Sequence, residues 1–262
     1  MAFITLLTDF GVRDGYAGVL KGVIWKIAPE AQIADITHAI SPQNILEGAM
    51  ALDKTVPFFP AGTIHVAVVD PGVGTKRESV AARLGDAIVV GPDNGLFSLL
   101  LERAENLGQP VEVVKLDKPA FWLPDVSHVF HGRDIFAPVA AHLANGVSLK
   151  EIGSPHSGLA RLEIPKPEQT DCGIRGQIMV VDHFGNLISN IPIDTLAGKG
   201  EPIVQCHGRE LRGIKRTFGE VAAGDLAVIS GTMGELEIVV NQGSAAEILG
   251  AKVGDPVEVR FL

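Results

Sequence analysis

The first 70 residues alternate between short apolar strands and amphipathic helices, and this alternation limits the possible folds more than any other feature of the sequence. Apolar, β-branched runs predict strands at 3–7, 33–36 and 66–69. Helical spacing of apolar residues predicts helices over 15–28 and 41–54. Strands that are joined through helices run parallel in one sheet, and the helices cover that sheet. We therefore expect a parallel sheet with helices packed on it.

Both predicted helices have recognisable starts. Asp14 stands where an N-cap is expected for the first helix, and Pro42 stands where the first helical residue of the second is expected. The apolar spacing predicts that one face of the first helix is buried, made of Tyr16, Val19, Leu20, Val23, Ile24 and Ile27.

The pattern changes after about residue 154. Pro155, Pro165 and Pro167 lie close together with little helical period, which is typical of a passage between domains. Beyond it, short strand-like runs are separated by Gly, Pro, Asn and Asp, and only 245–249 suggests a helical turn.

We therefore predict an α/β protein of two domains. A Rossmann-like N-terminal α/β domain is expected over 1–155 and a linker over 156–173. A smaller C-terminal, all-β, barrel-like domain is expected over 174–262.

The composition restricts the class of protein and its partners. The 262 residues are 46% hydrophobic and 20% charged, which is enough for a sizeable core. A net charge of -9 argues against nucleic acid or an anionic membrane as a partner, and no apolar run approaches the ~18 residues of a membrane span. Cys172 and Cys206 have no CxxC spacing, which fits a reducing cytoplasm and leaves a single disulfide open.

Polar residues gather at strand ends and turns. The segment 65–77, HVAVVDPGVGTKR, begins as a strand, reaches Asp70, turns through two glycines and returns a positive charge at Arg77. Ligands of open α/β sheets bind at the carboxyl ends of strands. Other residues in comparable positions are Asp9, Asp14, Asn94, His131, Asp182 and Asn186.

Each of these residues also has a structural explanation when it is taken alone. Asp14 can cap a helix, Asn94 suits a turn, and Asp70 can form an ion pair with Arg77. From the residues alone we predict a small-molecule enzyme or binder that uses an acid, a base and an arginine.

Cofactor and metal motifs are not found in the sequence. The turn at 71–74 lacks the third glycine of the dinucleotide fingerprint and opens no helix, which argues against NAD. There is also no Walker loop, no HExxH or paired His spacing and no GxSxG elbow. We therefore predict neither a cofactor nor a metal.

Six motifs together resemble one family along nearly the whole chain. They are TDFGxxDxY at 8–16, DITHxIxPQ at 35–43, VVDPGVGTxR at 68–77, GPDNGL at 91–96, FHGRDIFAP at 130–138 and VDHFGNLISNI at 181–191. They resemble the S-adenosyl-L-methionine hydroxide adenosyltransferases, which are relatives of fluorinating and chlorinating enzymes. The resemblance implies an α/β domain followed by a β-barrel-like domain, and a homotrimer with sites between subunits. It also implies that S-adenosylmethionine and water give adenosine and L-methionine.

The resemblance also implies roles for individual residues. Asp70, Arg77 and His131 would hold and activate the attacking water, and Asp9 would bind both ribose hydroxyls. Asp182 would pair with the methionine ammonium, Asn186 would contact adenine, and Asp14 and Phe130 would line the site. The contact to the methionine carboxylate is expected around 230–235 and stays unassigned.

Two alternatives remain beside the hydrolase. A sensor that binds S-adenosylmethionine or adenosine without reacting would need everything except Asp70, Arg77 and His131. A halogenase of the related group carries a tyrosine in place of Asp70 and an insertion that this chain lacks. A carboxylate repels a halide and gives water an acceptor, so Asp70 favours the hydrolase.

Overall fold

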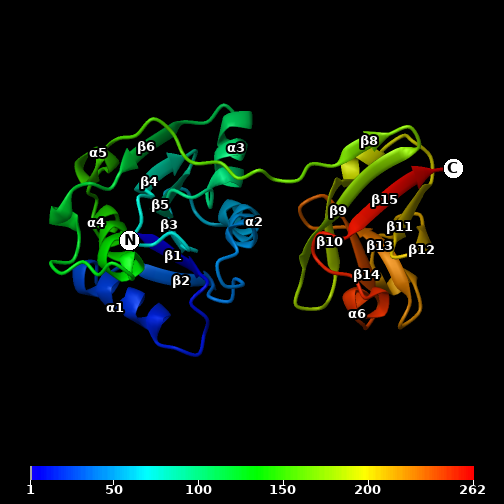
Figure 1. Cartoon of the computed structure of the whole chain (residues 1–262), viewed down its shortest axis with the longest axis horizontal. Helices are drawn as coiled ribbons and strands as arrows, with labels where there is room; N and C mark the ends of the chain where they lie inside the picture. The colour runs from blue at the N-terminus through cyan, green and yellow to red at the C-terminus, as the bar shows by residue number, and fades with distance from the viewer. Residues whose placement is uncertain (1) are drawn as a thin grey trace. The chain divides into compact units, whose positions relative to one another are not determined.

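The structure, a computed structural model, describes residues 2–262 and has a mixed α/β fold with two large sheets (Figure 1). The chain divides into two compact units, which we call unit 1, up to Glu163, and unit 2, Ile164–Leu262. None of the helices in this described part is both long and apolar enough to cross a membrane.

Unit 1 contains a seven-stranded sheet in the order β2-β1-β3-β5-β4-β6-β7. Its strands are β1 Phe3–Thr8, β2 Gln32–Thr37, β3 Ile64–Val68, β4 Ser79–Leu84, β5 Ala87–Pro92, β6 Val111–Lys115 and β7 Ser154–Pro155. The strands β2, β1 and β3 run parallel, as the sequence predicts, and β5 runs parallel to β3. By contrast, β4 pairs antiparallel with β5 and β6, and β6 pairs antiparallel with β7. Hence the sheet is mixed.

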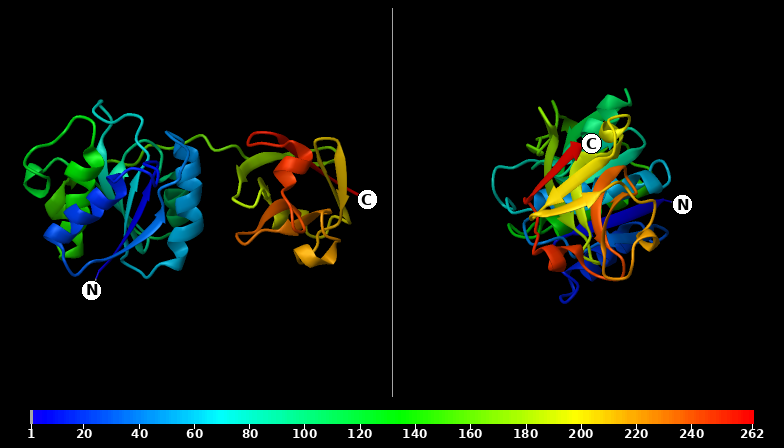
Figure 2. Two further views of the ribbon diagram at one scale, coloured as in Figure 1. Left: turned by 90° about the horizontal axis from the view of Figure 1, so that it is seen from below. Right: turned by 90° about the vertical axis from the view of Figure 1, so that its right-hand side faces the viewer.

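Helices cover both faces of this sheet (Figure 2). One face packs on α1 (Tyr16–Ile27), α4 (Ala137–Ala144) and α5 (Leu149–Ile152), and the other packs on α2 (Ile45–Thr55) and α3 (Ser98–Asn106). Successive residues of a strand point to opposite faces, so a strand can contribute to both cores. On β1, Ile4 and Leu6 enter the first core and Leu7 enters the second.

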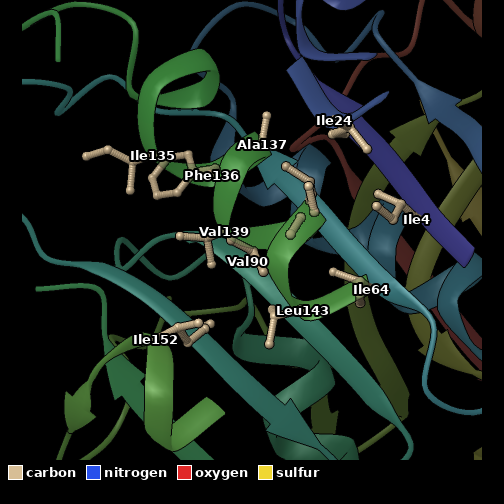
Figure 3. Close-up of a cluster of buried hydrophobic side chains, with 14 of the residues drawn as sticks. Ile4, Ile24, Ile64, Val90, Ile135, Phe136, Ala137, Val139, Leu143 and Ile152 are labelled. Carbon is tan, nitrogen blue, oxygen red and sulfur yellow. The ribbon is translucent and has the colours of Figure 1, made fainter. Parts of the chain in front are cut away.

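Figure 3 shows the first of these cores, in which Ile4, Ile24, Ile64 and Phe136 are at most 2% exposed. Such burial explains why the strands read as nearly continuous apolar runs rather than as alternating ones. The strands are therefore packed on both faces, which holds the residues at their carboxyl ends in fixed positions.

The predicted start of the first helix was wrong. Gly15, not Asp14, is the N-cap of α1; no side chain caps the helix, and Asp14 is exposed. The predicted buried face was also too wide. Leu20 and Ile24 are buried, but Tyr16 is 50% exposed because its ring packs edge-on against Phe10 and Phe130 instead of entering the core.

The predicted start of the second helix was wrong as well. Asn44 is the N-cap of α2, and its side chain accepts a hydrogen bond from Glu47 N at 3.1 Å. Pro42 lies before the helix, in a turn that is closed by Asn44 N donating to Ser41 O at 3.0 Å. An Asn cap satisfies one of the first free N–H groups, which a Pro at the helix start does not do.

Unit 2 contains an eight-stranded sheet that is nearly barrel-shaped. Its strands are β8 Glu168–Thr170, β9 Gly173–Val181, β10 Leu187–Pro192, β11 Pro202–Cys206, β12 Arg209–Arg212, β13 Leu226–Ser230, β14 Glu235–Val240 and β15 Pro256–Phe261. The order is β12-β11-β15-β9-β10-β14-β13, with β8 beside β9. Lys215 N, just beyond β12, donates to Val228 O of β13 at 2.7 Å, so the two ends of the order approach each other.

Short helices complete the two units. The 3-10 turns are Val56–Phe58, Pro119–Phe121, Ile193–Leu196 and Phe218–Glu220, and a π-helical segment spans Gly132–Phe136. The helical turn expected at 245–249 is confirmed as α6, Ala245–Leu249. Cys172 and Cys206 are both free thiols.

The two faces of α1 give a first prediction. Ile24→Ala should lower the free energy of unfolding of unit 1 by about 2–5 kcal/mol, because it leaves a cavity in a fully buried position. Val19→Ala, a matched control on the 39% exposed side of the same helix, should change it by less than about 0.5 kcal/mol. Denaturant titration measures both, and equal effects would contradict the described packing.

A second prediction concerns His65 of β3, whose Nδ1 lies 2.8 Å from Thr5 Oγ1. Burial lowers the pKa of His65 to about 4. Well above pH 6.5 the imidazole is neutral in both the folded and the unfolded state, so its ionisation does not change the free energy of unfolding. As the pH falls from 6.5 toward 4, the unfolded chain binds the proton first, so the free energy of unfolding falls, by about 3 kcal/mol in all.

Titration of His65 by NMR measures this pKa directly. Replacing His65 with Asn should flatten the loss of stability between pH 6.5 and 4. An apparent pKa near 6.5 for His65 in the intact protein would show that the side chain is not buried as described.

Candidate active site

An ion pair lies at the carboxyl end of β3. Arg77 donates from Nε to Asp70 Oδ1 at 2.9 Å and from Nη2 to Asp70 Oδ2, which makes the contact bidentate. The side chains of Arg77 and Asp70 are 9% and 5% exposed. Bidentate pairs of this kind are strong and fixed in geometry, and burial protects this one from screening.

The turn between these two residues requires a glycine. Gly74 has a φ of 76°, and a side chain at this position would collide with the backbone carbonyl of His128. The turn is also attached to the segment that follows β5, because Asn94 Nδ2 donates to Val69 O at 2.8 Å. The close approach brings the segment before His131 against the Asp70 turn.

His131 joins the ion pair through Arg77. Arg77 Nη2 lies 2.9 Å from His131 Nδ1. Arginine can only donate, so Nδ1 must accept, and the neutral ring carries its proton on Nε2. Burial lowers the pKa of His131, and the charge of Arg77 lowers it further, against the opposing effect of Asp70. At neutral pH this leaves an Nε2–H group as the donor that His131 offers.

A π-helical segment directly after His131 fixes its position. Phe130 O accepts hydrogen bonds from the N–H groups of Arg133 and Asp134 at 3.1 and 3.2 Å. Asp134 is fully buried, accepts from Arg133 Nε at 2.5 Å and accepts from Ser127 N at 2.8 Å. π-helical turns are frequent at functional sites, and here the turn holds the histidine on a rigid backbone.

Asp9 lies at the same edge of the sheet as Asp70. The strands β1 and β3 are parallel neighbours with Thr8 opposite Val68, so the residues that follow each strand are adjacent. Asp9 Oδ2 accepts from Gln43 N at 2.8 Å, and Oδ1 takes no hydrogen bond from residues 2–262.

The expected lining residues differ in how firmly they are held. The Phe130 ring packs edge-on against Phe10 at 5.7 Å and Tyr16 at 5.4 Å, and the Arg133 guanidinium lies 5.2 Å from its centroid. Asp14 is exposed in the loop before α1 and makes no hydrogen bond with the described chain. The structure thus brings Asp9, Asp70, Arg77, Phe130 and His131 to one edge, whereas Asp14 lies in an exposed loop.

Asp182 and Asn186 form a turn in unit 2. Asp182 Oδ1 accepts from Phe184 N at 2.9 Å and Asn186 N at 2.8 Å, and Asp182 Oδ2 accepts from Asn186 Nδ2 at 2.8 Å. Asn186 is 7% exposed. The carboxylate therefore orients Asn186, whose own amide oxygen takes no hydrogen bond from residues 2–262.

An open hollow of about 530 Å³ lies beside this turn. Its wall is mostly apolar and includes Phe184, Asn186, Phe218, Val240, Gln242 and Ser244. The ring of Phe184 is 74% exposed. Aromatic walls with two side-chain amides, those of Asn186 and Gln242, suit a flat heteroaromatic ring.

Sequence reasoning missed several of these residues. The Nδ1 atom of His38 lies 2.8 Å from Thr8 Oγ1. The backbone carbonyl of His38 accepts a hydrogen bond from Gly11 N at 2.7 Å. A histidine at the end of a predicted strand was the available signal for this contact. The aromatic residues Phe184 and Phe218 could have been noticed as large apolar side chains in turn regions. Within residues 2–262, no group of three or more His, Cys, Asp or Glu is placed to hold a metal ion.

Family models match both units. Residues 4–153 match the SAM hydroxide adenosyltransferase N-terminal domain, and residues 176–258 match the C-terminal domain. The chain belongs to the SAM hydroxide adenosyltransferase family.

Full-length relatives agree with this membership. A protein of Thermus thermophilus named (R)-S-adenosyl-L-methionine hydrolase is 42% identical, with 98% of each chain covered. One of the same name from Salinispora tropica is 39% identical, with 98% of this chain and 97% of the relative covered. A fluorinase of Actinopolyspora mzabensis is 26% identical over 98% of this chain and 96% of its own.

A crystal structure of an uncharacterized conserved protein from Thermotoga maritima is also similar. It has a TM-score of 0.90 and 36% identity, covering 98% of this chain and 99% of that one.

The link between Arg77 and His131 gives a third prediction. Arg77→Met should raise the pKa of His131, because it removes a positive charge and leaves the Asp70 carboxylate unneutralised beside the ring. NMR titration of the His131 ring measures the change. Arg103→Met serves as the control, because Arg103 pairs with Asp53 and not with these groups. An unchanged pKa of His131 in Arg77→Met would contradict the contact.

Proposed function

We propose that this chain hydrolyses S-adenosyl-L-methionine to adenosine and L-methionine by attack of water at C5′. The observation that carries the proposal is the chain of contacts from the nearly buried Asp70 through Arg77 to His131 at the carboxyl edge of the sheet. Membership of the family and the hydrolase names of relatives at 39% and 42% identity support the same substrate.

Water activation is assigned to Asp70. His131 Nδ1 is occupied as an acceptor for Arg77, so the free nitrogen of the ring is a donor and orients the water rather than deprotonating it. Asp70 accepts from Arg77 at both oxygens and has lone pairs left to accept a proton of the water. A well-placed acid or base contributes roughly 10²–10⁴-fold to the rate.

The leaving group needs no acid. The sulfonium departs as a neutral thioether, so catalysis consists of making water nucleophilic and holding it in line with the C–S bond. Good positioning of this kind can be worth about 7–11 kcal/mol. Arg77 stabilises hydroxide character and fixes Asp70.

Other residues would hold the substrate. Asp9 has one free carboxylate oxygen for the ribose hydroxyls, while Asp14 and Phe130 would line the site. Asn186 with its aromatic hollow would take adenine. Asp182 would pair with the methionine ammonium; it already accepts three hydrogen bonds, which leaves roughly one of its four acceptor positions.

A halide is a poor fit to this site. Asp70 presents carboxylate oxygens at 5% exposure, and these oxygens accept hydrogen bonds and offer a halide no donor. Water gains from the same carboxylate, because it needs an acceptor for its proton.

Several broader expectations belong to the same proposal. The domains are expected to be a Rossmann-like one over 1–155 and an all-β one over 174–262, with a linker over 156–173. We further propose a homotrimer, a cytoplasmic location and a reaction without cofactor or metal. Analytical ultracentrifugation, cell fractionation and assay after chelation test these three points.

The fourth prediction tests the role of Asp70. Asp70→Asn keeps the shape of the side chain but removes its charge, and it should lower kcat at least about 10²-fold while the affinity for S-adenosylmethionine changes little. Asp53→Asn, whose side chain pairs with Arg103 instead, is the control with normal turnover. Full activity of Asp70→Asn would contradict the assignment of water activation to Asp70.

Reaction in ¹⁸O-water tests the proposed function itself. Mass spectrometry should find the label on the 5′ oxygen of adenosine. Recovery of intact bound substrate after long incubation would indicate a sensor, and a 5′-halo nucleoside formed with chloride would indicate a halogenase. Either of these results would overturn the hydrolase proposal.

A further inference from the structure

The turn before α2 holds a glutamine in a backbone conformation that this residue seldom adopts. Gln43 has a φ of 66°. Pro42 precedes it, and Asn44 N donates to Ser41 O at 3.0 Å, which closes a four-residue turn. Proline at the second position and a positive φ at the third are the marks of a type II turn, in which the third residue is usually Gly or Asn.

The side chain of Gln43 does not compensate for this conformation. It is exposed, and it makes no hydrogen bond with residues 2–262. For a residue other than glycine the left-handed conformation costs roughly 1–2 kcal/mol. Such strain persists where the surroundings hold it and is often found at functional sites.

The strained turn orients the backbone N–H of Gln43. This N–H donates to Asp9 Oδ2 at 2.8 Å. In a type II turn the peptide between the second and third residues faces the opposite way from its orientation in a type I turn. A change to type I would therefore point this N–H away from Asp9.

The backbone around Asp9 is fastened separately. Thr8 Oγ1 lies 2.8 Å from His38 Nδ1, and Gly11 N donates to His38 O at 2.7 Å. These contacts fix the chain on both sides of Asp9 but not its carboxylate. Within residues 2–262, Gln43 N is the donor that sets the rotation of that carboxylate.

We propose that Gln43 is a positioning residue for substrate binding: the type II turn at 41–44 aims its N–H at Asp9 Oδ2 and presents Oδ1 to the paired hydroxyls of the ribose. The inference rests on the proposed function, in which Asp9 binds the ribose. Gln43 acts through its backbone, so its side chain can be dispensed with while its φ cannot.

A substitution series separates the backbone from the side chain. Gln43→Gly accepts a positive φ freely and should keep KM for S-adenosylmethionine within about twofold of the wild-type value. Gln43→Val disfavours a positive φ and should raise KM roughly tenfold, because only the fraction of molecules with the type II turn binds well. Gln43→Ala should lie between them, and kcat should stay nearly constant throughout.

A matched control excludes a general loss of stability. His207 also has a positive φ, 47°, and lies in unit 2 outside the proposed site. His207→Val should lower the unfolding temperature without changing KM. If Gln43→Gly raised KM as much as Gln43→Val, the side chain would be the functional part and the proposal would be overturned.

Hydrogen exchange tests the contact without any turnover. The amide of Gln43 should exchange slowly in the wild-type protein and faster in Asp9→Ala, because it is exposed to solvent once its acceptor is gone. Equal exchange in the two proteins would refute the proposed contact even if S-adenosylmethionine is hydrolysed. Failure of the wild-type protein to hydrolyse S-adenosylmethionine would refute the proposed function instead.

Discussion

The ion pair between Asp70 and Arg77 is the interaction on which the site depends. Arg77 also donates to Ser79 Oγ at 2.7 Å and to the carbonyl of Glu78 at 3.3 Å, and it contacts His131 Nδ1 at 2.9 Å. One guanidinium therefore fixes the carboxylate, the start of β4 and the tautomer of the histidine. Loss of one partner from a buried pair leaves an uncompensated charge, which costs about 3–5 kcal/mol. Local stability and the proposed chemistry thus share one group.

The sequence predicted which residues share one edge of the sheet better than it predicted their contacts. Asp9 and Asp70 follow neighbouring parallel strands, and the carboxyl ends of such strands meet at one edge whatever the loops do. The contact of His131 with Arg77 depends on a π-helical turn and on Gly74, where any side chain would collide with the carbonyl of His128. Neither feature has a periodic signal in the sequence. The left-handed backbone of Gln43 was hidden for a similar reason, because only the preceding proline hinted at it.

The errors in the fold have the same origin. The spacing of apolar residues predicted that Tyr16 would enter the core. Periodicity shows which face of a helix is apolar, but it does not show how far along the helix the sheet covers that face. Near the edge of the sheet Tyr16 finds aromatic partners in Phe10 and Phe130 instead. Strand direction is likewise not written in a run of apolar residues. The hairpin at Gly85, with a φ of 61°, turns β4 antiparallel beside β5.

The two carboxylates at the sheet edge are placed in different surroundings, and this difference suits different tasks. Asp70 is neutralised by a guanidinium that contacts both of its oxygens, whereas Asp9 receives one hydrogen bond from a neutral backbone amide. The Oδ1 atom of Asp9 takes no hydrogen bond from residues 2–262, which favours hydroxyl donors of a ligand. The charge of Asp70 is balanced by Arg77, so the buried carboxylate is not a bare anion before the reaction, and its remaining lone pairs can accept a hydrogen bond from water. Adjacent parallel strands thus place an aspartate at the same edge of the sheet, and the residues in the following loops determine the hydrogen bonds that each aspartate can make.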